Sequence, residues 1–157
     1  MTTRPPELPV AFDARHRPLF QTPSWCVLLH RNQWNLGRCI VVLRTRAIDD
    51  PLALTFAERD ELWSVVLPRL SAALTAAFAP DRLNYAHLAN RQRHVHWHVV
   101  PRYAPDAVRE VAGVTFRDRR PGRMFRSSKA GRVPRDVREA IARQLLAHLP
   151  HETGLRA

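Results

Sequence analysis

The feature that most constrains the fold is a run of alternating histidine and apolar residues in the middle of the chain. From residue 94 to residue 100 the chain reads His-Val-His-Trp-His-Val-Val, and Pro-Arg follows. Strict alternation is the period of a β-strand with two unlike faces. His94, His96 and His98 therefore share one face of a predicted strand. Pro101 has no N–H to give to a sheet and is expected to end it.

The residues alone leave three interpretations of this histidine row open. The first is an ordinary solvated face of an amphipathic strand. The second is a metal site, because neutral imidazole binds zinc, copper or iron. Residues two apart on a strand lie about 6.8 Å apart, so two of the histidines can converge on one ion but three on a straight strand cannot, and His87 would be an extra ligand. The third fits the spacing best: a nucleophile and hydrogen-bond donors laid along an extended anion such as a phosphate chain.

Other short runs predict the rest of an antiparallel sheet. Residues 25–29 and 38–43 are apolar and are expected to pair across a polar turn. Residues 83–89 alternate and are expected to form the strand before the histidine strand, with a turn at 90–93. Residues 113–116 are expected to form a short edge strand. The pattern predicts an α+β fold with an antiparallel sheet of about five strands.

Two helices are predicted to accompany this sheet. Thr55 and Glu58 have the spacing of a capping box, and apolar residues then recur at intervals of three and four as far as Phe78. Pro68 falls inside this main helix and is expected to kink or split it, since it removes a backbone hydrogen bond. Pro134 suits the first turn of a C-terminal helix. The apolar face of that helix is formed by Val137, Ile141, Leu145 and Leu149.

Length and composition favour one folded domain. A chain of 157 residues that is 45% hydrophobic has room for a real core. We expect an N-terminal arm rich in proline and arginine at 1–23, a single domain at 24–150 and a C-terminal tail at 151–157. No apolar run reaches the roughly 20 residues of a membrane span, and the arm lacks the pattern of a secretory signal. Cys26 and Cys39 lie in apolar runs and are expected to be buried thiols of a cytoplasmic protein.

The basic residues predict anionic partners. The formal net charge is +11, and Lys129 is the one lysine among 25 basic residues. Such a charge promotes non-specific nucleic-acid binding and would also favour a polyphosphate substrate. A basic nucleic-acid-binding protein with a vestigial histidine row is therefore the rival hypothesis from another functional class. The arginine-rich residues 117–126 are expected to be a solvated loop.

The run from His94 to Val100 resembles the signature of the histidine triad (HIT) superfamily of nucleotide hydrolases and transferases. The Pro-Arg after it matches many members, and a looser likeness covers most of residues 24–125. Transferase branches often carry glutamine at the third position, so His98 resembles the hydrolase branches, such as diadenosine polyphosphate hydrolases. The resemblance implies a hydrolase of dinucleoside polyphosphates or nucleoside 5′-phosphoramidates. It also implies a homodimer and no metal or other cofactor in the protein, although the substrate can carry Mg²⁺.

The resemblance also implies roles for the three histidines. His96, in the middle, would be the nucleophile that forms a nucleotidyl-histidine intermediate. His98 would hydrogen-bond the phosphoryl oxygens. His94 would orient its neighbours and relay a proton towards the leaving group.

Substrate-binding residues follow from the same likeness. Relatives place an amide or hydroxyl side chain just before the histidine strand, and Asn90 is the choice here, with Gln92 in reserve. By position in the first hairpin, the residues expected beside the nucleoside are His30, Asn32 and Gly37. Two departures are evident: Arg38 and Arg46 stand where many relatives carry histidine, and the glycine-rich loop of many triad proteins is missing.

Overall fold

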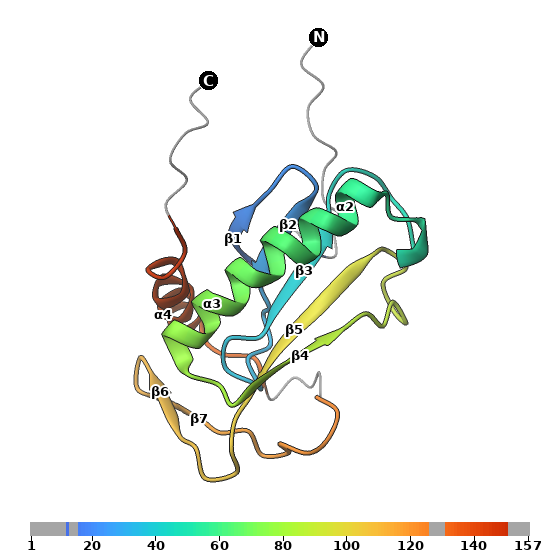
Figure 1. Ribbon diagram of the computed structural model, residues 1–157. Helices are drawn as coiled ribbons and strands as arrows, with labels where there is room; N and C mark the ends of the chain where they lie inside the picture. The colour runs from blue at the N-terminus through green and yellow to red at the C-terminus, as the bar shows by residue number, and fades with distance from the viewer. Residues whose placement is uncertain (1–11, 13–15, 126–130, 151–157) are drawn as a thin grey trace.

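Five antiparallel strands form one sheet in the order β1-β2-β3-β5-β4 (Figure 1). The computed structural model describes residues 12, 16–125 and 131–150. The strands are β1 (Arg17–Gln21), β2 (Trp25–Leu29), β3 (Cys39–Leu43), β4 (Arg82–Ala86) and β5 (His96–Arg102). The predicted α+β fold with a five-stranded antiparallel sheet and two main helical segments is confirmed. The predicted tail at 151–157 and most of the predicted arm lie outside the described residues.

The fifth strand of the sheet is not the predicted one. It is β1, which comes from the range expected to be an arm and pairs with β2. β1 is an edge strand with an irregularity between Pro18 and Phe20, and an edge strand tolerates a proline because one side of its backbone needs no partner. The predicted edge strand at 113–116 is instead β7 (Val114–Phe116), which pairs with β6 (Arg109–Val111) in a separate two-stranded sheet.

The histidine strand is shifted along the chain by two residues from its predicted position. β5 begins at His96, so His94 precedes it, and β5 continues through Pro101 to Arg102. The pairing of β3 with β5 stops at Val99, whereas that of β4 reaches Arg102. Pro101 therefore lies where β5 has a partner on one side only, which is why its missing N–H does not end the strand.

The main helical segment begins where the capping box predicts. Thr55 accepts a hydrogen bond from the backbone N–H of Glu58, and the Glu58 carboxylate accepts one in return from the N–H of Thr55. The segment runs as α2 (Phe56–Glu61), a π-helical turn (Leu62–Val66) and α3 (Leu67–Phe78). The predicted interruption at Pro68 thus takes the form of a widened turn just before the proline, and a short 3-10 turn (Pro51–Ala53) precedes α2.

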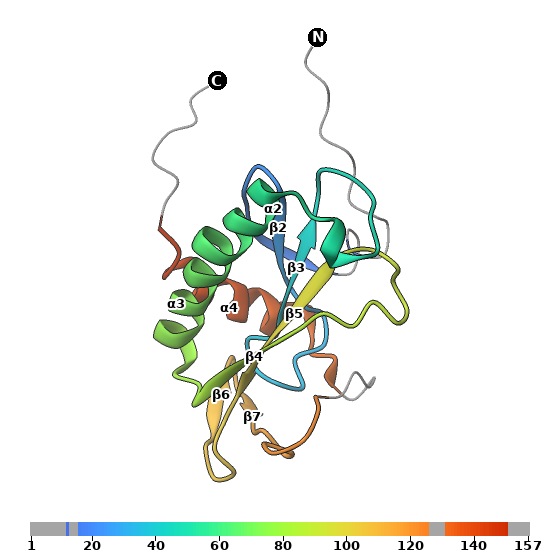
Figure 2. The same cartoon turned by 45° about the vertical axis from the view of Figure 1, so that its right-hand side comes forward.

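The helices cover one face of the sheet (Figure 2), and the opposite face carries the predicted histidine row beside Phe12. α3 and α4 (Arg135–Leu146) share one apolar core with alternate residues of β2, β3 and β5. On the opposite face a smaller apolar cluster joins Phe12 to Cys26, Leu28, Ile40 and Val42. Both cysteines are buried, as predicted. Among the described residues, no helix combines the length and apolarity needed to span a membrane.

Candidate active site

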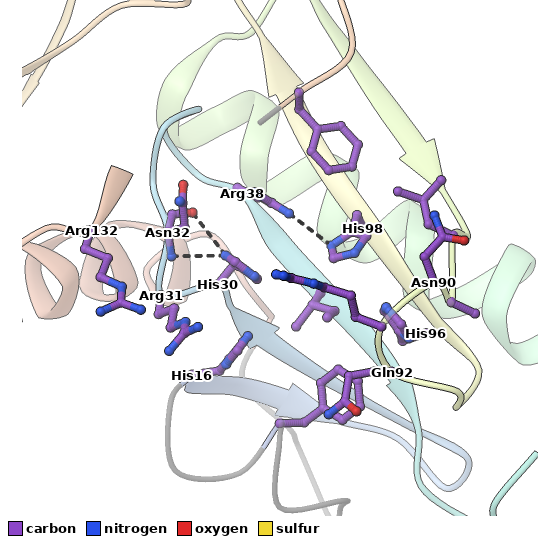
Figure 3. A pocket seen from close by; sticks show the side chains of 16 residues that line it. His16, His30, Arg31, Asn32, Arg38, Asn90, Gln92, His96, His98 and Arg132 are labelled. Atoms are coloured by element: carbon purple, nitrogen blue, oxygen red, sulfur yellow. Dashed lines mark hydrogen bonds between the residues drawn. The ribbon is translucent and has the colours of Figure 1, made fainter. Parts of the chain in front are cut away.

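A cavity of about 630 Å³ opens on the sheet face that carries the histidines (Figure 3). Four histidines, four arginines and three amide side chains line it, and none of its described lining residues is acidic. Such a lining favours an anionic ligand, because it offers many N–H donors and no carboxylate to repel the ligand. The polar lining residues are His16, His30, Arg31, Asn32, Arg38, Asn90, Arg91, Gln92, His96, His98 and Arg132.

His96 is held by the backbone of its own chain in one tautomer. Its Nδ1 lies 2.7 Å from the carbonyl oxygen of His94. A carbonyl can only accept, so Nδ1 carries the proton and Nε2 keeps its lone pair. Burial lowers the pKa of His96, an effect that the His94 carbonyl partly offsets and that His87 and His94 add to. The His96 ring is therefore neutral at neutral pH, with one nitrogen free to act as a nucleophile.

His94 itself is buried and does not line the cavity. Its Nε2 lies 2.7 Å from the carbonyl oxygen of Leu43, at the end of β3. Two successive ring-to-carbonyl bonds thus tie β3 to His94 and His94 to His96. The arrangement orients the ring of His96 through the backbone of His94 rather than through its side chain.

His98 contacts a buried arginine. Nη2 of Arg38 lies 3.4 Å from Nδ1 of His98 (Figure 3), and the Arg38 guanidinium carbon is 4.7 Å from the centre of the Phe125 ring. Arg38 is only 1% exposed. Burial, followed by the charge of Arg38, lowers the pKa of His98 to about 3, whereas burial lowers the pKa of Arg38 only to about 10. At neutral pH the guanidinium is therefore charged and the imidazole is not.

A row of imidazole rings crosses the cavity from β1 to β5. Consecutive ring centres are 4.7 Å apart for His16 and His30, 6.0 Å for His30 and His98, and 5.1 Å for His98 and His96. Nδ1 of His30 accepts a hydrogen bond of 3.0 Å from the N–H of Asn32. Burial, with a further contribution from Arg38, lowers the pKa of His30 to about 2. His30, His96 and His98 are therefore neutral rings at neutral pH, beside the positive charge of Arg38.

Comparison with solved structures gives a consistent match for this architecture. A histidine triad protein from Sinorhizobium meliloti superposes with a TM-score of 0.70 at 19% identity, over 91% of this chain and 96% of that chain. For a histidine triad protein from Marinobacter aquaeolei the TM-score is 0.66 at 22% identity, over 93% and 97%. This chain has the histidine triad fold.

A third similar structure is that of a hypothetical histidine triad nucleotide-binding protein from Sulfolobus tokodaii. Its TM-score is 0.60 at 15% identity, over 85% of this chain and 83% of that chain. By sequence, no protein-family model and no curated protein matches this chain. The resemblance noted from the residues at 94–102 is therefore supported by three-dimensional structure.

The triad fold brings most of the predicted site residues to one cavity. His96 and His98 line it from β5, His30 and Asn32 from the segment after β2, and the predicted phosphate-side amides, Asn90 and Gln92, from its rim. The predicted turn at 90–93 is part of a longer connection, because β4 ends at Ala86 and β5 begins at His96.

Gly37 lies away from the cavity, against the helical face of the sheet. Its φ is +81°, and a Cβ built on it would come within 2.9 Å of side-chain carbons of Leu74 and Phe78 on α3. Its N–H donates to Oε1 of Gln33, over 2.8 Å. The turn needs glycine at this position for close packing under α3, and Gly37 is not among the described residues that line the cavity.

The two arginines that depart from the usual triad pattern have different surroundings. Arg46 lies outside the cavity and forms an ion pair of 2.7 Å with Glu58 of the capping box. Arg38 lines the cavity beside His98. Sequence reasoning left the role of both positions open, although an arginine at the start of a buried strand is a signal, because it must be enclosed by the fold. His16 and Phe125 carry no comparable local signal.

The proposed basic loop after β7 is partly buried rather than only solvated. Arg102 of the Pro-Arg pair forms a buried ion pair of 2.7 Å with Asp118 and also donates to the carbonyl oxygens of Arg120 and Arg123. These bonds fix the loop that places Phe125 over His98, with ring centres 5.5 Å apart. Residue 126, the last of the predicted loop, lies outside the described residues.

The second interpretation of the histidine row was a metal site. Within the described part of the chain, no group of three or more His, Cys, Asp or Glu residues is placed to hold a metal ion. His87 does not line the cavity, and its ring centre is 6.2 Å from that of His96.

Proposed function

We propose that this protein hydrolyses a nucleoside 5′-phosphoanhydride or phosphoramidate through a covalent nucleotidyl-histidine on His96. The observation that carries the proposal is the tautomer of His96, which places a nitrogen lone pair at a cavity lined by arginines and amides. The nucleotide-binding designation of the Sulfolobus tokodaii protein of the same fold supports it. Dinucleoside polyphosphates are the substrates that best match so basic a cavity.

In the first step, Nε2 of His96 attacks the α-phosphorus of the substrate. A nitrogen–phosphorus bond forms, and the bond from phosphorus to the leaving oxygen or nitrogen breaks, with its electron pair going to the leaving group. Nδ1 keeps its proton on the His94 carbonyl, which stabilises the positive charge that develops on the ring. The N–H of His98 and the Arg38 guanidinium lie beside the reacting group to bind its phosphoryl oxygens.

In the second step, water attacks the same phosphorus and the nitrogen–phosphorus bond breaks. The electron pair of that bond returns to Nε2, the water contributes its oxygen to the nucleoside monophosphate, and its proton passes through solvent to the released leaving group. Splitting one displacement into two in this way lowers the barrier of each. Asn90 and Gln92 on the rim would bind the departing phosphates, and His30 and Asn32 on the opposite side would face the nucleoside. The homodimer and the cytoplasmic location remain predictions.

The proposal is tested by replacing the nucleophile. We expect His96→Ala to lower kcat on diadenosine polyphosphates and on adenosine 5′-phosphoramidate by at least about 1,000-fold, because it removes the group that forms the covalent bond to phosphorus. The matched control is His148→Ala, an exposed histidine beyond the end of α4. Rapid quenching followed by intact-protein mass spectrometry should show one added nucleotidyl group in the wild type and none in His96→Ala.

Unchanged turnover in His96→Ala would remove His96 as nucleophile. Salt-sensitive binding of DNA or RNA by a wild-type protein that turns over none of these nucleotides would favour the rival nucleic-acid-binding hypothesis.

A further inference from the structure

We propose that Arg38 fixes the proton of His98 on Nε2, so that the third triad histidine presents an uncharged N–H donor to the cavity over the whole physiological pH range. Besides offering its own charge to the phosphoryl group, Arg38 thus positions the N–H of His98. The consequence for catalysis rests on the proposed function, whereas the state of the His98 ring does not.

The chemistry of the guanidinium decides the tautomer. Nη2 of Arg38 is within 3.4 Å of Nδ1 of His98, with hydrogen-bond geometry. Arginine has five N–H donors and no acceptor. Nδ1 must therefore be the acceptor and carry the lone pair, which leaves the single proton of a neutral ring on Nε2. A protonated ring would direct a second N–H at the guanidinium, so the contact also disfavours the charged form.

Arg38 cannot easily turn away from this contact. It immediately precedes β3, its side chain is almost fully buried, and the Phe125 ring lies against its guanidinium. Strand pairing sets Ile40 of β3 opposite His98 of β5. Arg38, two residues before Ile40, is therefore held in the same part of the sheet as His98. Arg38 is thus enclosed by three separate parts of the chain.

The other charged or titratable groups around His98 act in the same direction. His96 and His30 have their ring centres 5.1 and 6.0 Å away. Besides burial, the groups that lower the pKa of His98 are Arg38, His96, His16 and His87, all of them bases. No described residue lining the cavity supplies a carboxylate that would favour the charged ring.

This arrangement separates two tasks in the proposed reaction. The positive charge for the phosphoryl group resides on Arg38, which keeps it at any physiological pH. His98 supplies a directed N–H without a charge, so it adds no positive charge beside His96. An arginine in the position where many triad proteins carry histidine is therefore compatible with a complete triad.

The test observes the ring itself. Two-bond proton–nitrogen correlation spectra of the full chain, with His98 assigned from His98→Gln, distinguish the two neutral tautomers and the charged ring. Between pH 8 and pH 5 we expect the wild type to show His98 only as the Nε2–H tautomer. In Arg38→Met we expect the Nδ1–H tautomer to appear and protonation to begin within this range. We also expect kcat to fall by at least about tenfold, with partial recovery in Arg38→Lys, which restores a donor.

Arg132→Met is the control, because Arg132 lines the same cavity and is expected to leave the His98 spectrum unchanged. An Nδ1–H tautomer in the wild type, or an unchanged His98 spectrum in Arg38→Met, would overturn the proposal, and the wild-type measurement decides even where Arg38→Met does not fold. Since the spectra need no turnover, a protein with the expected spectra that hydrolyses no nucleotide contradicts the proposed function alone.

Discussion

At the scale of single residues, the site depends on backbone carbonyls that specify where imidazole protons reside. The Leu43 carbonyl accepts from His94, and the His94 carbonyl accepts from His96. A ring whose proton is directed at a carbonyl cannot rotate or change tautomer without leaving a buried polar group unpaired, which costs about 1–3 kcal/mol. His94 therefore contributes to the site although it does not reach the cavity.

Replacing the side chain of His94 distinguishes orientation from proton relay. His94→Ala keeps the carbonyl but removes the donor to Leu43, so we expect kcat to fall by about 10- to 100-fold, equivalent to about 1.4–2.7 kcal/mol, with little change in KM. His94→Gln, whose amide can donate but does not titrate, should recover most of this loss. Steady-state kinetics on a diadenosine polyphosphate provides the measurement. A His94→Gln variant no better than His94→Ala would instead support a relay role.

At the scale of elements, the sequence patterns predicted those features of strands and helices that interactions between near neighbours in the chain determine. Alternation identified the faces of β5, and the capping box identified the start of α2. β1 was not predicted as part of the sheet, because within this edge strand only Leu19 is fully buried and its sequence shows little periodicity. The predicted end at Pro101 was wrong, since the extent of β5 depends on where β3 stops pairing with it.

The site shows the same division between local and long-range information. His96, His98 and the rim amides could be predicted because motif and hairpin order place them together. The contact of Arg38 with Phe125 could not, because it depends on the loop after β7, which returns to the sheet only in the tertiary structure. Arg102 anchors that loop through its ion pair with Asp118 and its hydrogen bonds to the loop backbone.

Replacing Arg102 should therefore destabilise the fold and also loosen the loop after β7 that carries Phe125. Arg102→Met leaves Asp118 buried without its ion pair. Because of this unpaired charge, we expect the free energy of unfolding to fall by about 3–5 kcal/mol. KM should also rise, because Phe125 loses its support beside His98. Urea denaturation and steady-state kinetics measure the two effects. Arg82→Met, at the exposed residue paired with Arg102 across β4 and β5, is the control and should change stability by less than about 0.5 kcal/mol. Equal effects of the two substitutions would contradict an anchoring role.

At the scale of the whole molecule, a formal charge of +11 coexists with three uncharged histidines in the cavity, His30, His96 and His98. Burial is the largest cause of the lowered pKa of His30, His96 and His98. Folding thus keeps these rings neutral while the surface stays cationic. The native state consequently binds fewer protons than the unfolded chain at mildly acidic pH, and acid adds charge to a molecule that is already strongly positive.

The sign of the pH dependence follows from this difference in bound protons. Unfolded histidine has its ordinary pKa of 6.5, whereas the pKa of folded His98 is about 3. Stability should therefore be greatest above pH 6.5 and fall as the pH decreases below it, because the unfolded state binds protons that the native state does not bind. The buried carboxylate of Glu58, which the Arg46 ion pair holds at a pKa of about 2, adds to the loss only below its ordinary value of 4.5. Urea midpoints between pH 6.5 and 4.5 thus report mainly on the histidines.

Replacing His98 tests this pH dependence. We expect His98→Gln, which can still accept from Arg38, to flatten the slope of stability against pH, and the exposed-site control His148→Gln to flatten it less. A wild-type stability that is constant or rises on acidification through this interval would show that the rings take up protons in the folded protein, and the neutral row inferred for the site would then be wrong.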